Sequence, residues 1–335
     1  GSDEAVRIFI ADDGSIYVAG TIIGSAQFDG INVIVNGGPF AGEDLFLAKL
    51  SPDGNYQWIK SYGSSNQDWI DDMCISGNNI FLTGHYYGIF TAGPITLAPA
   101  GSSLAKFFMK VDADGNPIWG KNTGGTSWVS ASDDKLYIAG LFTGTASFDN
   151  VTFVSNGPTD LYMGAYDFSG NQLWVKQYGG TGSENMRSLR YHKPSNTIYW
   201  AGCFQNSMTL GSNSLSSAGQ FDIFVSKFDT DGDNIWAKKA GGANYDFANA
   251  TALDAAGNVF ISGYCMETAA FSNVNVISAG QGDAYIAKYD ANGNFQWVRG
   301  GGGSGQDNGM NLAVNNSGSI YLTGFFESAA TFGSV

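Results

Sequence analysis

FDIFVSKFDTDGDNIWAKKAGGANYD, residues 221–246, is the stretch of sequence that decides the fold. It contains two short apolar runs on either side of a turn that includes Asp231 and Gly232. A short hairpin loop needs a residue at positive φ, which Gly adopts without steric cost and which Asp or Asn tolerates beside it. The stretch therefore predicts two antiparallel strands, with Trp236 in the second strand.

The same pattern recurs along the whole chain. A tryptophan follows a turn of this kind five times, at spacings of 61, 55, 62 and 61 residues: Trp58, Trp119, Trp174, Trp236 and Trp297. A second anchor, an apolar strand that ends in Ala-Gly, Thr-Gly or Ser-Gly, has nearly the same period: Gly20, Gly84, Gly140, Gly202, Gly263 and Gly324. Two independent anchors that share one period indicate a tandem repeat.

Each repeat unit predicts four strands. In the fifth unit these are residues 247–254, 258–264 and 283–290, and a fourth strand from Phe295 that carries Trp297. We name them strands a, b, c and d, and a longer connection with an Ala-x-Phe pattern joins b to c. The strands are apolar in nearly continuous runs, so both faces of each sheet must be covered. Radially packed blades supply that cover.

The predicted fold class is therefore all-β, a β-propeller of four-stranded antiparallel blades. We expect a single domain, residues 1–335, with five complete blades and half of a sixth. A six-bladed ring is favoured over a seven-bladed one. The expected blade boundaries are approximately 1–65, 66–125, 126–181, 182–243, 244–304 and, for the partial blade, 305–335.

Composition narrows the functional classes. The net charge of −14, with only 16 Lys and Arg residues, argues against a nucleic-acid partner, since a phosphate backbone needs a basic face. No apolar stretch approaches the length of a membrane span, so we expect no membrane insertion. Cys74, Cys203 and Cys265 form no CxxC motif and fall in predicted strands, where we expect them to be small buried side chains.

The stretch 221–246 resembles the bacterial SBBP-type β-propeller repeat. That family pattern has an Asp that opens strand c, a Phe-Val-Ala-Lys strand, a D-x-x-G-N turn, a Trp in strand d, and then Gly-Gly and an acidic residue. The resemblance extends over essentially all 335 residues. It implies a repeat of large secreted or cell-surface proteins, notably Bacteroidota proteins exported by type IX secretion.

The third unit departs from this pattern. Ala165 replaces the strand-c lysine, and several residues are missing between Trp119 and Gly140. We therefore expect a shortened connection into the third blade. The final residues stop inside a b–c connection, so strands c and d of a sixth blade are expected from sequence beyond the given chain.

Acidic residues recur ten positions after the tryptophan. They are Asp68, Glu184, Asp246 and Asp307, with Asp3 at the equivalent position of the first unit. These carboxylates are candidates for a cation or polar-ligand site around one mouth of the propeller. The favoured alternative is that each accepts backbone N–H bonds in the turn between blades. No metal site is predicted, because the DTDGD run at 229–233 lacks the Glu that an EF-hand loop requires.

Departures from the repeat mark further ligand-binding candidates, because function on a repeated scaffold is expected where the repeat is broken. They are Trp69, Trp128, His85, Tyr86, Tyr87, Arg187, Arg190, Tyr191 and His192. Extra packing between blades is the alternative role for the aromatic members. The only two histidines, His85 and His192, lie in no recognisable catalytic motif, so no catalytic residue and no cofactor are predicted.

Two functional classes follow. The first is a non-catalytic extracellular binding or scaffold module that contacts other proteins or cell-surface components. The second is a carbohydrate-binding or glycoside-cleaving propeller, since acids are plentiful and exposed aromatic rings stack on sugars.

Overall fold

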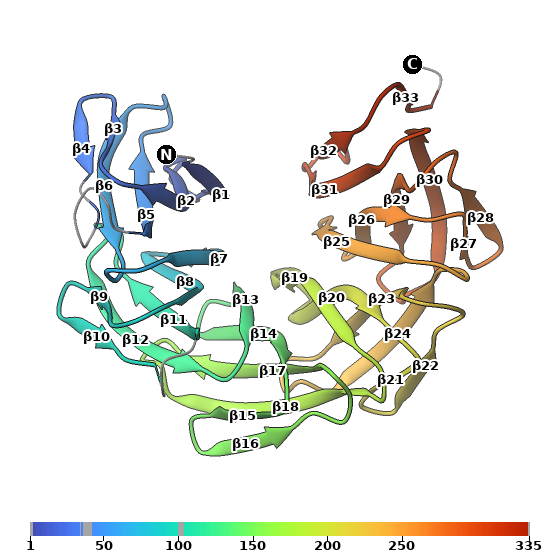
Figure 1. Ribbon diagram of the computed structural model, residues 1–335, viewed down its shortest axis with the longest axis horizontal. Helices are drawn as coiled ribbons and strands as arrows, with labels where there is room; N and C mark the ends of the chain where they lie inside the picture. Colours follow the sequence, from blue (N-terminus) through green and yellow to red (C-terminus); the bar gives the residue numbers. More distant parts are fainter. Residues whose placement is uncertain (1–2, 34, 36–41, 100–103, 334–335) are drawn as a thin grey trace. The chain divides into compact units, whose positions relative to one another are not determined.

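The computed structural model describes residues 3–33, 35, 42–99 and 104–333 and consists almost entirely of β-strands (Figure 1). In this part of the chain one short 3-10 helix, η1 (Lys193–Ser195), is the exception. The chain divides into two compact units, which are described separately. The first comprises Gly1–Ala139, Ala146–Thr152 and Ala165–Leu173, and the second the remainder.

The first unit holds two complete four-stranded sheets. Blade 1 has the order β1-β2-β5-β6, and blade 2 has the corresponding order β7-β8-β11-β12. The strands are β1 (Glu4–Ile10), β2 (Ile16–Ile23), β5 (Glu43–Leu50), β6 (Tyr56–Tyr62), β7 (Asp68–Ser76), β8 (Asn79–Tyr86), β11 (Ala105–Val111) and β12 (Pro117–Thr123). All neighbouring pairs are antiparallel, as hairpin turns between consecutive strands require.

The second unit holds blades 4 and 5, with the orders β19-β20-β23-β24 and β25-β26-β29-β30, and the hairpin β31-β32. The strands are β19 (Glu184–His192), β20 (Thr197–Phe204), β23 (Asp222–Phe228), β24 (Asn234–Ala240), β25 (Asp246–Leu253), β26 (Val259–Cys265), β29 (Asp283–Tyr289), β30 (Phe295–Gly303), β31 (Asp307–Val314) and β32 (Ile320–Phe326). The residues of blade 3 fall partly in each unit: β13 (Thr126–Ala131), β14 (Lys135–Phe142), β17 (Asp160–Asp167) and β18 (Gln172–Gly180). The prediction of an all-β propeller with four-stranded blades is confirmed.

The long connection between strands b and c is itself a small hairpin, which the sequence analysis did not predict. These elements are β3 (Ala26–Phe28), β4 (Ile31–Val33), β9 (Phe90–Ala92), β10 (Ile95–Leu97), β15 (Thr145–Phe148), β16 (Val151–Val154), β21 (Ser207–Leu210), β22 (Asn213–Ser216), β27 (Thr268–Phe271), β28 (Val274–Ile277) and, after β32, β33 (Ala330–Thr331). In blade 4 the hairpin pairs with the last strand of the preceding blade, where Gly180 lies opposite Met208.

This pairing explains the Gly-Gly motif at the end of strand d. A Cβ atom at Gly242 would lie 2.0 Å from the carbonyl oxygen of Thr268 in the neighbouring hairpin. No side chain fits at that distance, because the two backbones are in direct contact. The glycine therefore allows the hairpin of one blade to close against the last strand of the blade before it.

Strands b and c are buried on both faces, as predicted. Every residue of β20 and of β23 is buried, whereas the outer strand β24 alternates between buried and exposed positions. Cys74, Cys203 and Cys265 are buried in strands, as expected, and form no disulfide with one another. The described residues contain no helix with the length and apolar character needed to cross a membrane.

The repeated tryptophan joins neighbouring blades. In blades 1 to 4 its indole lies on the glycine of the c–d turn of the next blade, and in three of these blades it donates its N–H to a carbonyl of that turn. These bonds are Trp119 Nε1 to Phe168 O at 3.0 Å, Trp174 Nε1 to Thr230 O at 3.1 Å and Trp236 Nε1 to Ala291 O at 3.2 Å. Trp236 is 8% exposed. The other four tryptophans are of intermediate burial at the outer strand of their blades, and none of the five is exposed.

The connection into blade 3 is short, as the missing residues predicted. Only two residues separate β12 from β13, whereas five separate β6 from β7 and five separate β24 from β25. β13 is also shorter than the first strands β7 and β19. The deletion is therefore absorbed at the blade junction and not within a sheet.

The c–d turns are built on an aspartate that bonds its own backbone. In the fifth blade Asp290 Oδ1 accepts the N–H groups of Asn292 and Asn294, both at 2.9 Å. Asn294 Nδ2 donates to the other carboxylate oxygen at 2.8 Å. These hydrogen bonds lower the pKa of Asp290 below its ordinary value. Both carboxylate oxygens thus accept hydrogen bonds from within the turn, which supports the interpretation of the Asp-rich c–d segments as hairpin turns.

We expect Gly293→Ala to cost more stability than Gly318→Ala. Both glycines have φ near +80°, so both substitutions place an L-residue in the left-handed region, at about 1 kcal/mol. A Cβ at Gly293 would also lie 2.8 Å from Trp236 Cδ2, whereas a Cβ at Gly318 has nothing within 4 Å. Urea unfolding should therefore show a loss of about 3 kcal/mol for Gly293→Ala. Equal losses for the two variants would contradict the packing of Trp236 on the turn.

Candidate functional site

The repeated acids at the start of the first strands are buried, and most of them bond the turn that precedes them. Their carboxylates accept a backbone N–H from four residues earlier in the chain. The donors are Ser64 N to Asp68 at 2.5 Å, Gly242 N to Asp246 at 2.7 Å and Gly303 N to Asp307 at 2.6 Å. All three acids are fully buried. They hold the blade junction, and none is open to a ligand in solution.

Asp3 and Glu184 differ from this pattern. Asp3 is exposed and accepts the N–H of Ile23 at 2.9 Å. Glu184 is only 1% exposed, and the described part of the chain offers neither of its carboxyl oxygens a hydrogen-bond donor of good geometry. A buried charge without partners is costly, so Glu184 favours its neutral form.

A second buried acid faces each of these residues from the start of strand c. The two acids of a pair are always 24 residues apart: Asp44 with Asp68, Asp160 with Glu184, Asp222 with Asp246, and Asp283 with Asp307. In the first and the last of these pairs, the glycine between them lies against both carboxyl groups. A Cβ at Gly302 would be 2.8 Å from Asp283 Oδ2 and 2.7 Å from Asp307 Oδ2.

Burial raises the pKa of several of these acids. Burial raises the pKa of Asp68 to about 6 and the pKa of Asp246 to about 7. Burial, and then the charge of Asp160, raises the pKa of Glu184 to about 9. Glycoside cleavage requires two carboxyl groups that contact the substrate, and these pairs are enclosed at blade junctions.

The first strand carries a β-bulge at one repeated position. The strand pairing shifts by one residue at Val6, Asp71, Arg187, Asn249 and Met310. Each lies three residues after the repeated acid. A bulge re-aims the side chain of its extra residue and is frequent next to functional sites. The residue type varies from blade to blade while the backbone geometry does not.

In blade 2 the bulge brings three of the departures from the repeat together. The rings of Trp69 and His85 are 4.8 Å apart at an angle of 30°, and Tyr87 lies 6.2 Å from Trp69. Asp71 Oδ1 is 3.1 Å from His85 Nδ1, and Asp71 Oδ2 is buried without a hydrogen-bond partner. We call Trp69, Asp71, His85, Tyr87 and the neighbouring Lys106 the blade-2 shelf.

Lys106 completes this group from the third strand of the blade. It lies opposite His85 in the pairing of β11 with β8. Burial lowers the pKa of Lys106, and the charge of Asp71 acts in the opposite direction. The group thus places a carboxylate, an imidazole and an ammonium beside the half-buried ring of Trp69 and the exposed ring of Tyr87.

A second aromatic group lies in the other unit, around blade 5. The rings of Phe247 and Tyr264 are 5.1 Å apart at 19°, and Tyr245 is nearly parallel to Phe247, at 6° and 6.3 Å. Phe221 lies 5.4 Å from Phe247. The charge of Arg187 acts on the Tyr264 hydroxyl. We call Phe221, Tyr245, Phe247, Tyr264 and Arg187 the blade-5 shelf.

Sequence reasoning missed most of these residues. Trp69, His85 and Arg187 were found as departures from the repeat, but Asp71, Lys106 and the four rings of the blade-5 shelf were not. A signal was present, since Trp69 and Phe247 both directly follow a repeated acid. The bulge positions were not visible, because a bulge is a property of strand pairing.

The remaining candidates lie elsewhere. Tyr86 is fully buried, and its hydroxyl donates to Asn122 at 2.7 Å, so it is not available to a ligand; its pKa is raised by burial to about 12. Trp128 is half-buried in β13. His192 is buried, with Nδ1 2.7 Å from Ser195 Oγ and Nε2 3.1 Å from the carbonyl of Asp254, a turn contact without an acidic partner.

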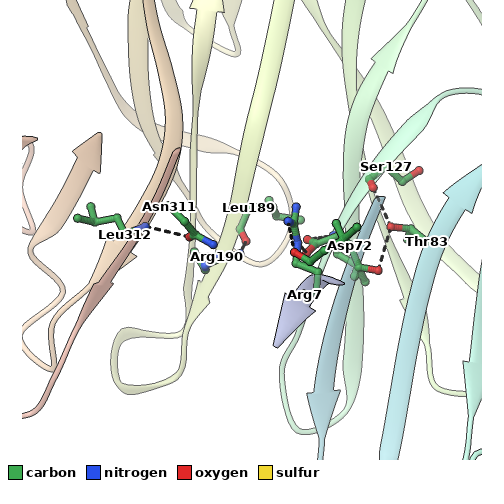
Figure 2. Close-up of polar contacts among 10 residues, drawn as sticks. Arg7, Asp72, Thr83, Ser127, Leu189, Arg190, Asn311 and Leu312 are labelled. Atoms are coloured by element: carbon green, nitrogen blue, oxygen red, sulfur yellow. Dashed lines mark hydrogen bonds and ion pairs between the residues drawn. The ribbon is translucent and has the colours of Figure 1, made fainter. Parts of the chain in front are cut away.

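Polar contacts connect strands of neighbouring blades in the first unit, and the contacts drawn in the second unit join adjacent residues (Figure 2). In the first unit Arg7 Nε lies 2.6 Å from Asp72 Oδ1, and Asp72 Oδ2 accepts the N–H of Val129 at 3.1 Å. Thr83 donates to the carbonyl of Ser127 at 2.8 Å. In the second unit Arg190 Nη1 donates to the carbonyl of Leu189 at 2.9 Å. These contacts link strands of neighbouring blades in the first unit, a structural role.

No three His, Cys, Asp or Glu side chains come close enough to hold a metal ion within residues 3–33, 35, 42–99 and 104–333. The best candidates for a ligand site are therefore the two shelves, one in each unit, which combine polar and aromatic side chains partly open to solvent. Their chemistry is that of binding: flat rings for stacking, and charged groups that donate and accept hydrogen bonds.

Comparison with known proteins gives one informative relative. No family model matches the chain. An uncharacterized WD repeat-containing protein of Acanthamoeba polyphaga mimivirus is 22% identical over 375 aligned residues, which cover 86% of this chain. The chain spans about a quarter of that relative, 27% of its length. Propellers of repeated blades are characteristically interaction scaffolds. The fold and this similarity together support a propeller repeat protein and suggest a non-catalytic module for protein interaction.

Proposed function

We propose that the chain is a non-catalytic binding module of a larger secreted or cell-surface bacterial protein, where it contacts other proteins or cell-surface components. The observation that carries this proposal is the contrast between a recurring scaffold and variable residues at the β-bulge, of which Arg187 and Met310 are exposed and the other three half-buried. The tryptophan, the turn glycine and the buried acids recur from blade to blade, whereas the bulge residue changes in every blade where its position is seen. A scaffold that varies only its displayed side chains is suited to recognition.

Several features support the finer parts of the proposal. The resemblance of residues 221–246 to the SBBP-type repeat favours a bacterial protein exported to the surface, and type IX secretion is the corresponding route. The acidic balance, −14 overall, favours protein or surface partners over nucleic acid. The chain is similar to a stretch that makes up about a quarter of a longer relative, which is consistent with a module in a larger protein.

Surface location is tested by protease treatment of intact source cells, followed by detection with antibodies raised against residues 1–335. We expect external protease to remove most of the signal while a cytoplasmic marker remains intact. A signal that is protected until the cells are lysed would contradict the proposed location.

The binding role is tested by cross-linking the purified chain to intact cells and identifying the linked peptides. Cross-links should concentrate at the first strands, near the variable bulge positions, and competition with unlabelled chain should remove them. Cross-links spread evenly over the outer strands would contradict a recognition surface at this place. A turnover assay on a panel of glycosides with the same preparation should show no hydrolysis.

A further inference from the structure

The two shelves occupy equivalent positions in their blades. In each first strand, the residue that follows the repeated acid pairs with the residue that follows the strand-b glycine. This pair is Trp69 with His85 in blade 2 and Phe247 with Tyr264 in blade 5. The corresponding pairs elsewhere are Glu4 with Thr21, Asn185 with Cys203, and Asn308 with Phe325.

The blade fold does not require rings at these positions. Blades 1 and 4 form the same four-stranded sheet with Glu4 and Thr21 or with Asn185 and Cys203 in their place. The strand-d tryptophan, by contrast, is present in every complete blade, as a packing role predicts. The rings also remain partly open to solvent, with Tyr87 38% and Tyr245 40% exposed. The packing of the blade therefore does not explain why aromatic pairs occur in blades 2 and 5.

Polar groups beside the blade-2 rings have unused hydrogen-bonding capacity. The Asp71 side chain is 18% exposed, and its Oδ1 lies 3.1 Å from His85 Nδ1, so this oxygen still has a lone pair for a second hydrogen bond. The Lys106 ammonium forms no ion pair or hydrogen bond with any residue of the described part of the chain. Buried or half-buried polar groups are normally paired, so groups of this kind mark a place where a ligand supplies the missing partners.

We propose that the two shelves are saccharide-binding sites, each of which accepts a pyranose ring of an oligosaccharide. A pyranose has an apolar C–H face, which stacks on an aromatic ring, and a rim of hydroxyl groups that donate and accept hydrogen bonds. In blade 2, Trp69 offers the stacking face, Asp71 accepts from a hydroxyl and Lys106 donates to an oxygen. In blade 5, Phe247 and Tyr264 offer the rings and Arg187 the donor.

A saccharide fits these groups better than a protein segment does. The centre of a protein interface is depleted in charged residues, whereas the blade-2 shelf combines a carboxylate and an ammonium directly beside its rings. A nucleic acid is disfavoured by the net charge of −14. This inference rests on the proposed role as a binding module, and it adds the ligand class and the two sites.

The test begins with the folded full chain on an array of neutral and acidic oligosaccharides, followed by titration calorimetry with the best ligand. We expect two sites per chain. Trp69→Ala should weaken one site by about tenfold, and Phe247→Ala should weaken the other by a similar factor. Trp69→Phe keeps an aromatic face and should retain binding, and Asp71→Asn should weaken the blade-2 site without removing the ring. Trp297→Phe, a change at a strand-d tryptophan, is the matched control and should bind as the wild type does.

Three results would overturn the inference. They are an array without any bound saccharide, binding that survives in the Trp69→Ala/Phe247→Ala double variant, and capture of peptides in place of saccharides by the same residues. Circular dichroism of each variant establishes that it is folded. Because cross-linking to cells is measured separately, a protein partner that still binds the double variant would leave the proposed module intact while the saccharide sites fail.

Discussion

Glu184→Gln is expected to make the protein more stable than the wild type at pH 9, by about 6 kcal/mol, and to have little effect at pH 4. The carboxyl of Glu184 is 1% exposed and accepts no hydrogen bond of good geometry, and Asp160 lies near it. Burial, with the charge of Asp160, raises the pKa of Glu184 to about 9 from an ordinary value of 4.5. Glutamine has the shape of the neutral acid and does not ionise at any pH in this range.

The direction of the pH effect follows from which state holds the proton. The folded protein keeps the Glu184 proton up to about pH 9, whereas the unfolded chain releases it near pH 4.5. The stability that the neutral group contributes is therefore fully present below pH 4.5 and is lost as the pH rises to 9. Asp68, with a pKa near 6, and Asp246, with a pKa near 7, add to the loss over the lower part of this range.

Urea unfolding of both proteins at several pH values between 4 and 9 measures this difference. The free energy of unfolding of the wild type should decline across the range, and the decline above pH 7 should be much smaller in Glu184→Gln. Asp3→Asn is a suitable control, because Asp3 is the equivalent residue of blade 1 but is exposed. A wild-type stability that rises from pH 5 to pH 9 would show that Glu184 is charged in the folded protein.

Trp236→Ala is expected to lower the free energy of unfolding by about 3–5 kcal/mol. Trp236 is 8% exposed, packs on the ring of Tyr199 at 6.0 Å and lies against Gly293 of the next blade. Its indole N–H donates to the carbonyl of Ala291 at 3.2 Å. Removal of the ring thus leaves a cavity between two blades and one carbonyl without its donor.

Trp297→Ala provides the comparison for this substitution. Trp297 has the same place in the repeat, but it is half-buried, and no c–d turn of a following blade is present in the described residues. We expect its loss to cost about half as much as the loss of Trp236 in urea unfolding at the same pH. Equal costs would mean that the tryptophan acts within its own blade and does not join neighbouring blades.

The candidate site was only partly predictable. Trp69, His85 and Arg187 stand out in the sequence because they interrupt a repeat, and the structure brings Trp69 and His85 into contact. Lys106 and Asp71 do not stand out, because lysine and aspartate occur throughout the repeat. Their proximity to the rings depends on the register of β8 with β11 and on the bulge in β7.

The sequence by itself determined the repeat, the four strands of each blade and their order. These features follow from local chemistry. A turn glycine at positive φ, an aspartate before it that accepts backbone N–H groups, and an apolar run on each side lie within about 15 residues and together specify a hairpin. The sequence also determined the shortened entry into blade 3, since a deletion must fall in a connection when the strands are paired.

Only the tertiary structure decided the rest. The small b–c hairpins, the acid pairs and the two shelves each join residues of different strands or blades, such as Phe221 with Tyr264 or Asp160 with Glu184. Whether an acid is charged depends on its burial and on the acid beside it, and neither is a property of the local sequence. The role of each of these residues was therefore set by strand register and blade packing, which bring together side chains distant along the chain.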